Sequence, residues 1–288
     1  MSQSSAQDAQ LLNRFVAWAE DKPDVRAALL IGSRARADHP ADPWSDIDLV
    51  LTVRDVQPYL NNGDWLEEIA PVWTTHVEST LAGVLERRVL FEGGHDFDVV
   101  LVTDTQLSRL IQTAEVVDII RRGIRVLIDK DRLMSRITLP LRPRTTYMPP
   151  TQAEFLNVVN DFWFHAAWTA KKLRRGELWA AITSCDGYMK RLLLKMMEWH
   201  ARAVSSHSYD TWFSGRFVEE WGDSRALAEL GDAFAHYNAP DIKRALLASM
   251  DLFRWLATET AVQFTYPYPS EGDSEVTRWV QELLEPIR

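Results

Sequence analysis

The chain has 288 residues, 46% hydrophobic and 25% charged, a composition typical of a globular protein with one large or two ordinary domains. A formal net charge of −9 argues against a nucleic acid partner, which needs a basic surface, and suits either a small cationic substrate or simply solubility. The single cysteine, Cys185, excludes an intrachain disulfide and a cysteine-based zinc site. Without a signal peptide or an apolar stretch of transmembrane length, we expect a cytoplasmic protein with no membrane partner.

The first half of the chain alternates between short apolar runs and short helical patterns. A helical spacing over 8–21 begins it, and shorter helical pieces lie around 65–69 and 106–111. Strands are predicted over 25–31, 47–53, 72–77, 87–91, 97–102 and 124–128. We therefore predict an α+β fold in which residues 1–140 form a domain built on one mixed sheet with flanking helices.

Small and acidic residues lie at the end of one predicted strand and at the start of the next. Gly32 and Ser33 follow the first strand, and Asp46 and Asp48 stand at the head of the second. Residues i and i+2 of a strand share a face, so both carboxylates project together beside the Gly-Ser turn. Paired carboxylates bind Mg²⁺, and such a turn lets backbone N–H groups approach a phosphate. The alternative is that both aspartates are ordinary turn residues.

A third acid heads a later predicted strand. Asp98 lies near the start of 97–102, which a turn at 92–95 joins to the preceding strand as a hairpin. A lone carboxylate there is costly unless it binds metal, is paired, or caps a turn. Nucleotidyl transfer uses such a set, because carboxylate-held Mg²⁺ stabilises phosphoryl charge and a further acid can accept the proton of the attacking hydroxyl. We predict Asp46, Asp48 and Asp98 as the metal-binding and catalytic residues.

The second half of the chain is predicted to be helical. The proline-rich segment 141–150 has the character of an extended linker. Thr151 with Glu154 three residues later forms a capping-box pattern, which marks the start of a helix. Helical patterns then cover 151–174, 177–203, 224–236, 241–264 and 274–284. We expect residues 151–288 to form a helical bundle that binds the second substrate.

Charged side chains on the first of these helices are candidate substrate contacts. Asp161 and Lys172 lie on one polar stripe, with Lys171 beside it. If this stripe faces the substrates, Lys171 or Lys172 can reach the β- and γ-phosphates of a nucleotide as a point charge. Asp161 can then receive a cationic group. The alternative for each residue is a solvated helix face.

Three further residues have both a binding and a structural interpretation. Asp186 either pairs with Lys190 one helical turn later or receives a cationic substrate group. Trp163 either packs in the core or stacks on adenine or a sugar ring. Arg34, next to the Gly-Ser turn, is a candidate clamp for phosphate oxygens.

The motif from Gly32 to Asp48, with Gly-Ser-Arg at its start and Trp-Ser-Asp-Ile-Asp at its end, resembles the signature of DNA-polymerase-β-like nucleotidyltransferases. Within that superfamily the chain is similar to the aminoglycoside 6-adenylyltransferases, which modify streptomycin. The hairpin segment 89–94 leading to Asp98, and segments 161–171 and 186–199, carry this closer similarity. The similarity is weak beyond about residue 202.

This resemblance implies transfer of AMP from ATP to a hydroxyl of a cationic aminoglycoside, with the 6-hydroxyl of streptomycin as the foremost expectation. Asp46 and Asp48 would hold Mg²⁺ as the cofactor, while Gly32 and Ser33 would contact the triphosphate. Asp98 falls where related enzymes carry a third metal ligand or a general base. ATP would bind to the α/β domain and the drug against the helical domain. The sequence does not fix the oligomeric state, and a monomer is the favoured expectation.

Two other functions stay open at this stage. A nucleotidyltransferase of the same superfamily can act on another small molecule or on a protein hydroxyl, although proteins of the latter kind are usually shorter and lack a large second domain. A non-catalytic nucleotide-binding module is the second alternative. The presence of all three acids argues against it.

Overall fold

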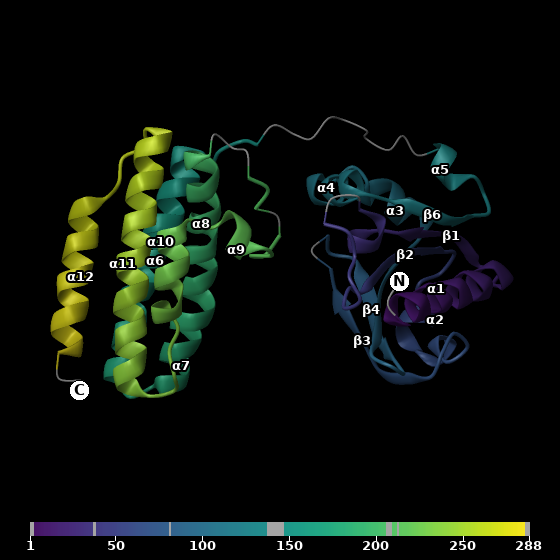
Figure 1. Ribbon diagram of the computed structural model, residues 1–288, viewed down its shortest axis with the longest axis horizontal. Helices are drawn as coiled ribbons and strands as arrows, with labels where there is room; N and C mark the ends of the chain where they lie inside the picture. The colour runs from purple at the N-terminus through teal and green to yellow at the C-terminus, as the bar shows by residue number, and fades with distance from the viewer. Residues whose placement is uncertain are drawn as a thin grey trace. The chain divides into compact units, whose positions relative to one another are not determined.

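The computed structural model describes residues 3–36, 39–80, 82–136, 147–205, 209–211 and 213–285. The chain divides into two compact units, Met1–Thr145 and Thr146–Arg288, which Figure 1 shows as a sheet-containing body and a helical body. Most of the linker predicted over 141–150 lies outside the described residues. Among the described helices, none is both long enough and apolar enough to cross a membrane.

One mixed sheet of six strands organises the first unit, in the order β3-β4-β5-β2-β1-β6. Among the described strand pairs, β2 and β5 run parallel and the others antiparallel. The predicted mixed sheet is confirmed, because each predicted strand lies within two residues of an observed one at either end. The strands are β1 (Val25–Leu30), β2 (Ile47–Val53), β3 (Val72–Ser79), β4 (Leu85–Phe91), β5 (His95–Val102) and β6 (Arg125–Asp129).

Helices cover both faces of this sheet (Figure 1). Alternate residues of β1 belong to different apolar clusters, Ala28 and Leu30 to one and Ala27 and Leu29 to the other, as the period of a strand requires. The first cluster packs under α1 and α2, and the second under α3, α4 and α5. The helical elements here are α1 (Gln3–Asp21), η1 (Gly32–Ala35), α2 (Gln57–Asn61), η2 (Asp64–Leu66), α3 (Asp104–Leu110), α4 (Ala114–Arg122) and α5 (Leu133–Arg136).

The second unit is a helical bundle, as predicted. The capping box forms as expected: the Thr151 hydroxyl accepts a hydrogen bond from the Glu154 amide, and the Glu154 carboxylate accepts one from the Thr151 amide. Phe162 and Phe253 stack at the centre of the core, with ring centroids 3.7 Å apart. The α-helices are α6 (Gln152–Arg174), α7 (Leu178–Ile182), α8 (Met189–Val204), α9 (Val218–Trp221), α10 (Ser224–Leu230), α11 (Ala239–Phe264) and α12 (Ser270–Leu284).

Two of the predicted helices are interrupted. The pattern over 177–203 contains a π-helical segment, η3 (Thr183–Tyr188), between α7 and α8. Within it the Asp186 carboxylate accepts a hydrogen bond from the amide of Ala235, a contact that helical periodicity does not reveal. The pattern over 224–236 ends early, because α10 passes into the 3₁₀ turn η4 (Gly231–Ala233).

A partly buried carboxyl on α8, that of Glu198, predicts a pH dependence for the stability of the bundle. Burial raises the pKa of Glu198 from its ordinary 4.5 to about 7, although Arg202 and Lys195 act in the opposite direction. Between these values the folded state retains a proton that the unfolded state has lost, so stability falls as the pH rises. Glu198→Gln should therefore raise the melting temperature at pH 8 by about 3 °C, corresponding to about 1 kcal/mol.

Thermal melts of the intact chain at pH 5 and pH 8 check this expectation. The gain should be smaller at pH 5, where Glu198 is mostly protonated in the folded protein. Glu282→Gln, on an exposed position of α12, is the matched control and should shift the melting temperature little at either pH. An equal gain for Glu198→Gln at both values would contradict the proposed linkage.

Candidate active site

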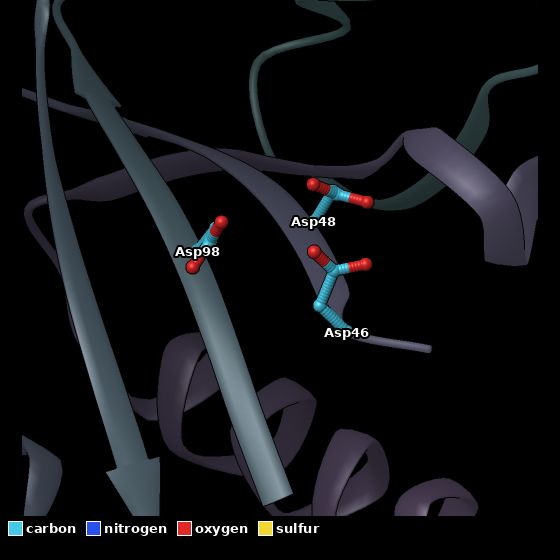
Figure 2. A group of neighbouring side chains, drawn as sticks. All are labelled: Asp46, Asp48 and Asp98. Atoms are coloured by element: carbon cyan, nitrogen blue, oxygen red, sulfur yellow. The ribbon is translucent and has the colours of Figure 1, made fainter. Parts of the chain in front are cut away.

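The parallel pairing of β2 and β5 brings the three predicted acids together. Asp48 on β2 is in register with Asp98 on β5, so their side chains lie side by side on one face of the sheet. Asp46 precedes Asp48 by two residues and projects to the same side. One oxygen from each carboxylate lies within 4.8 Å of the others, and Figure 2 shows the groups converging from the two strands. The structure thus brings together the three acids named from the sequence, and their metal-binding and catalytic roles stay predictions.

The Gly-Ser turn packs directly against the side chain of Asp48. At its entrance the Ile31 amide donates a 3.0 Å hydrogen bond to the carbonyl of Asp48. Gly32 then adopts a φ of +66°, and a Cβ built there would lie 1.8 Å from Asp48 Oδ2. Only glycine allows this approach of backbone to carboxylate at a positive φ. The sequence therefore needs glycine here for two independent physical reasons.

Ser33 presents a buried hydroxyl within this turn. The residue is only 8% exposed, and its Oγ has no hydrogen-bond partner in the part of the chain that the structure describes. A buried hydroxyl without a partner is energetically costly, so an additional polar group is expected at this position. A phosphate oxygen or a metal-bound water can supply it.

Electrostatics also favour a cation beside Asp98. The residue is 9% exposed, and burial raises the pKa of its carboxyl to about 6. Arg88 Nη2, 3.0 Å from Asp98 Oδ2, opposes this rise in pKa, while the nearby acids Glu86 and Asp46 add to it. Carboxylate oxygens are the donors that Mg²⁺ prefers. With the unpartnered Ser33 hydroxyl, the group fits a hard divalent cation.

Arg34 holds the loop that carries Asp46. Its Nε donates to the carbonyl of Asp46 at 2.9 Å, and its Nη2 donates to the carbonyl of Ser45 at 2.5 Å and to Asp8 Oδ2 at 2.7 Å. These contacts with the protein favour a positioning role. The phosphate clamp predicted from its place beside the turn has no support in this geometry.

Three predicted contacts on α6 have partners within the helical unit. Asp161 accepts hydrogen bonds from the Tyr188 hydroxyl at 2.8 Å, and its Oδ1 lies 2.7 Å from His165 Nδ1. Lys172 forms an ion pair with Glu177 at 2.6 Å. The Lys171 ammonium lies over the ring of Trp279, 5.5 Å from its centroid. Substrate contact by Asp161, Lys171 or Lys172 remains a prediction.

Two other predicted residues of the bundle have contacts within the fold. Trp163 is 4% exposed, and its indole N–H donates to the Tyr268 hydroxyl at 3.1 Å, so it packs in the core and has no free ring face for stacking. Asp186 Oδ2 accepts from the Ala235 amide at 3.0 Å, while its buried Oδ1 lies 3.6 Å from the Lys190 ammonium and has no hydrogen-bond partner among the described residues. The structural interpretation accounts for Trp163 and for one oxygen of Asp186.

Three residues of the site were not predicted from the sequence. Arg88, which pairs with Asp98 across the β4–β5 hairpin, could have been found by counting from the predicted turn. Asp8 and His95, which form a hydrogen-bonded pair beside Arg34, carry no comparable signal. Asp8 lies on a helix whose position over the sheet is set by packing alone.

Asp46 just before β2, Asp48 on β2, Asp98 in register on the parallel neighbour and a Gly-Ser turn against Asp48 form the kind of acid group that nucleotidyltransferase chemistry requires. The chain belongs to the Streptomycin adenylyltransferase family, whose model matches residues 6–283.

Comparison with characterised proteins identifies relatives of similar length. An aminoglycoside 6-adenylyltransferase of Bacillus subtilis (strain 168) is 24% identical over 283 residues, covering 96% of this chain and 97% of the relative. An aminoglycoside 6-adenylyltransferase of Campylobacter jejuni is 22% identical over 269 residues, which cover 91% of this chain and 91% of the relative. A crystal structure of an aminoglycoside 6-adenyltransferase from Bacillus subtilis aligns over 98% of both chains with 20% identity and a TM-score of 0.47.

Proposed function

We propose that this enzyme transfers AMP from ATP to a hydroxyl of an aminoglycoside and releases pyrophosphate, with the 6-hydroxyl of streptomycin as the first candidate acceptor. The observation that carries the proposal is the group of three acids, within 4.8 Å of one another, beside the Gly-Ser turn. The choice of acceptor rests on membership of the Streptomycin adenylyltransferase family and on relatives named as aminoglycoside 6-adenylyltransferases.

Each residue of the acid group has a role in this proposal. Asp46 and Asp48 would hold Mg²⁺, which when bound neutralises charge on the phosphoryl oxygens. Asp98 would complete the ligand set or accept the proton of the attacking hydroxyl, for which its place beside both acids is suitable. The small Gly32 lets the turn backbone approach the Asp48 carboxylate closely, and Ser33 supplies a buried hydroxyl that could donate to a phosphate oxygen beside it.

A cationic acceptor agrees with the charge of the protein. The net charge of −9 produces a field that attracts a polycationic drug. Within the bundle, Asp161 is the acid that we retain as a candidate contact, because its side chain is 27% exposed. Trp163 is omitted because it is buried, and Asp186 is omitted because the Ala235 amide and the Lys190 ammonium already lie against its carboxylate.

Pyrophosphate release with a panel of acceptors tests the proposal. Purified protein, ATP and Mg²⁺ are incubated with streptomycin and other aminoglycosides, and products are analysed by mass spectrometry. We expect pyrophosphate and an adenylylated drug with at least one aminoglycoside. Turnover with a non-aminoglycoside acceptor alone would support the wider nucleotidyltransferase alternative. ATP binding without turnover of any acceptor would support a non-catalytic module.

A further inference from the structure

A buried carboxylate on α1 lies close to the acid group without belonging to it. The side chain of Asp8 is 6% exposed, and both of its oxygens are hydrogen bonded. Oδ2 accepts from Arg34 Nη2 at 2.7 Å, and Oδ1 lies 2.5 Å from His95 Nδ1. The Arg34 side chain is itself only 14% exposed, so this ion pair is largely shielded from water.

One partner of Asp8 contacts the segment that carries Asp46, and the other lies on the strand that carries Asp98. Arg34 donates to the main-chain carbonyls of Ser45 and Asp46, immediately before β2. His95 is the first residue of β5 and precedes Asp98 by three residues on the same strand. Asp8 therefore connects the start of one acid-bearing strand to the start of the other.

Such a connection matters because a metal site depends on the spacing of its ligands. The parallel pairing fixes Asp48 against Asp98, but Asp46 precedes β2 and lies outside the strand pairing. Its backbone is held by the Arg34 guanidinium, and Asp8 orients that guanidinium. Removing one partner of a shielded ion pair leaves the other charge uncompensated, so loss of Asp8 should release Arg34 from this position.

We propose that Asp8 is a positioning residue for the acid group: acting through Arg34 and His95, it sets the position of Asp46 relative to Asp98. The proposal rests on the proposed function in one respect, that these acids hold a divalent cation. Side chains that orient metal ligands commonly alter metal affinity or activity by about 10- to 100-fold when replaced.

The test compares Asp8→Asn with a matched ion-pair variant, Asp131→Asn. Asp131 accepts a hydrogen bond from Arg26 Nε at 2.5 Å in the same unit, so both variants remove one carboxylate charge from an arginine. Mn²⁺ binding without nucleotide is followed by electron paramagnetic resonance, and AMP transfer is measured as a function of Mg²⁺ concentration. For Asp8→Asn we expect Mn²⁺ affinity and kcat/KM to fall at least about tenfold, with little change for Asp131→Asn.

A second pair of variants covers the case in which Asp8→Asn does not fold. His95→Ala removes one of the two contacts of Asp8 and should weaken Mn²⁺ binding. His95→Asn places an amide nitrogen near the position of the histidine Nδ1 and should restore Mn²⁺ binding. Wild-type Mn²⁺ affinity in Asp8→Asn or, where that variant does not fold, in His95→Ala would overturn the proposal.

The same measurements separate this proposal from the proposed function. If the wild-type protein binds Mn²⁺ but adenylylates no aminoglycoside, the acceptor assignment fails, while a loss of Mn²⁺ affinity in Asp8→Asn still supports the role of Asp8. If the wild-type protein binds no Mn²⁺, the metal site fails and the positioning role fails with it.

Discussion

Asp48→Asn is expected to reduce AMP transfer by about 10³-fold or more while leaving the fold intact. Asp48 lies between Asp98 in the neighbouring strand and the Gly32 turn, at the centre of the acid group. Asparagine has nearly the same shape, so the backbone hydrogen bond from Ile31 to the Asp48 carbonyl is preserved. What is lost is one negative charge of the three that would hold the cation.

Initial rates of pyrophosphate release, together with a thermal melt, measure this effect. Asp21→Asn, at the exposed end of α1, is the matched control and should retain full activity. Because like charges close together repel, Asp48→Asn should melt at the same temperature as the wild type or slightly higher in the absence of metal. Activity within threefold of the wild type, at saturating Mg²⁺ and ATP, would remove Asp48 from the proposed metal site.

Gly32→Ala is expected to impair both stability and transfer. A methyl group at this position would collide with Asp48 Oδ2, 1.8 Å away, and the φ of +66° is strained for any other residue. The positive φ alone should cost about 1–2 kcal/mol. Displacement of the Asp48 carboxylate should add a loss of about 10²-fold in kcat/KM, since misplacement of a reacting group by about 1 Å has effects of that size.

Gly83→Ala separates the two causes. Gly83 has a comparable φ of +74°, but an added Cβ would meet no described atom within 4 Å. We expect Gly83→Ala to lower the melting temperature through the positive φ alone, Gly32→Ala to lower it at least as much, and only Gly32→Ala to lose activity. Equal activity of the two variants, each assayed well below its melting temperature, would show that contact between Gly32 and Asp48 is irrelevant to catalysis.

The strands were predictable because their local pattern and their tertiary environment agree. The run 47–53 is apolar along nearly its whole length, and the strand it forms lies inside the sheet with helices on both faces. The Thr151 capping box was likewise predictable, since its partners are three residues apart. Where an interaction is local, the residue types suffice to identify it.

Predictions based on a single helix face were less reliable. Trp163 and Asp186 each had both a binding and a structural interpretation, because periodicity shows which residues share a face but not what that face contacts. The Tyr268 hydroxyl and the Ala235 amide, which bind their polar atoms, come from segments distant in the chain. The π-helical segment around Asp186 was missed for the same reason. It contains the Asp186 carboxylate, which is bound by the amide of Ala235, a residue distant in the chain.

The residue pattern alone was sufficient to place three acids and a Gly-Ser turn at strand ends, because strand period and turn chemistry are local properties. The folded chain added the neighbour relations: that β2 and β5 are parallel and bring Asp48 into register with Asp98, and that Asp8 reaches Arg34 and His95. Strand pairing and helix packing join segments far apart in the sequence, and no local pattern encodes those distances.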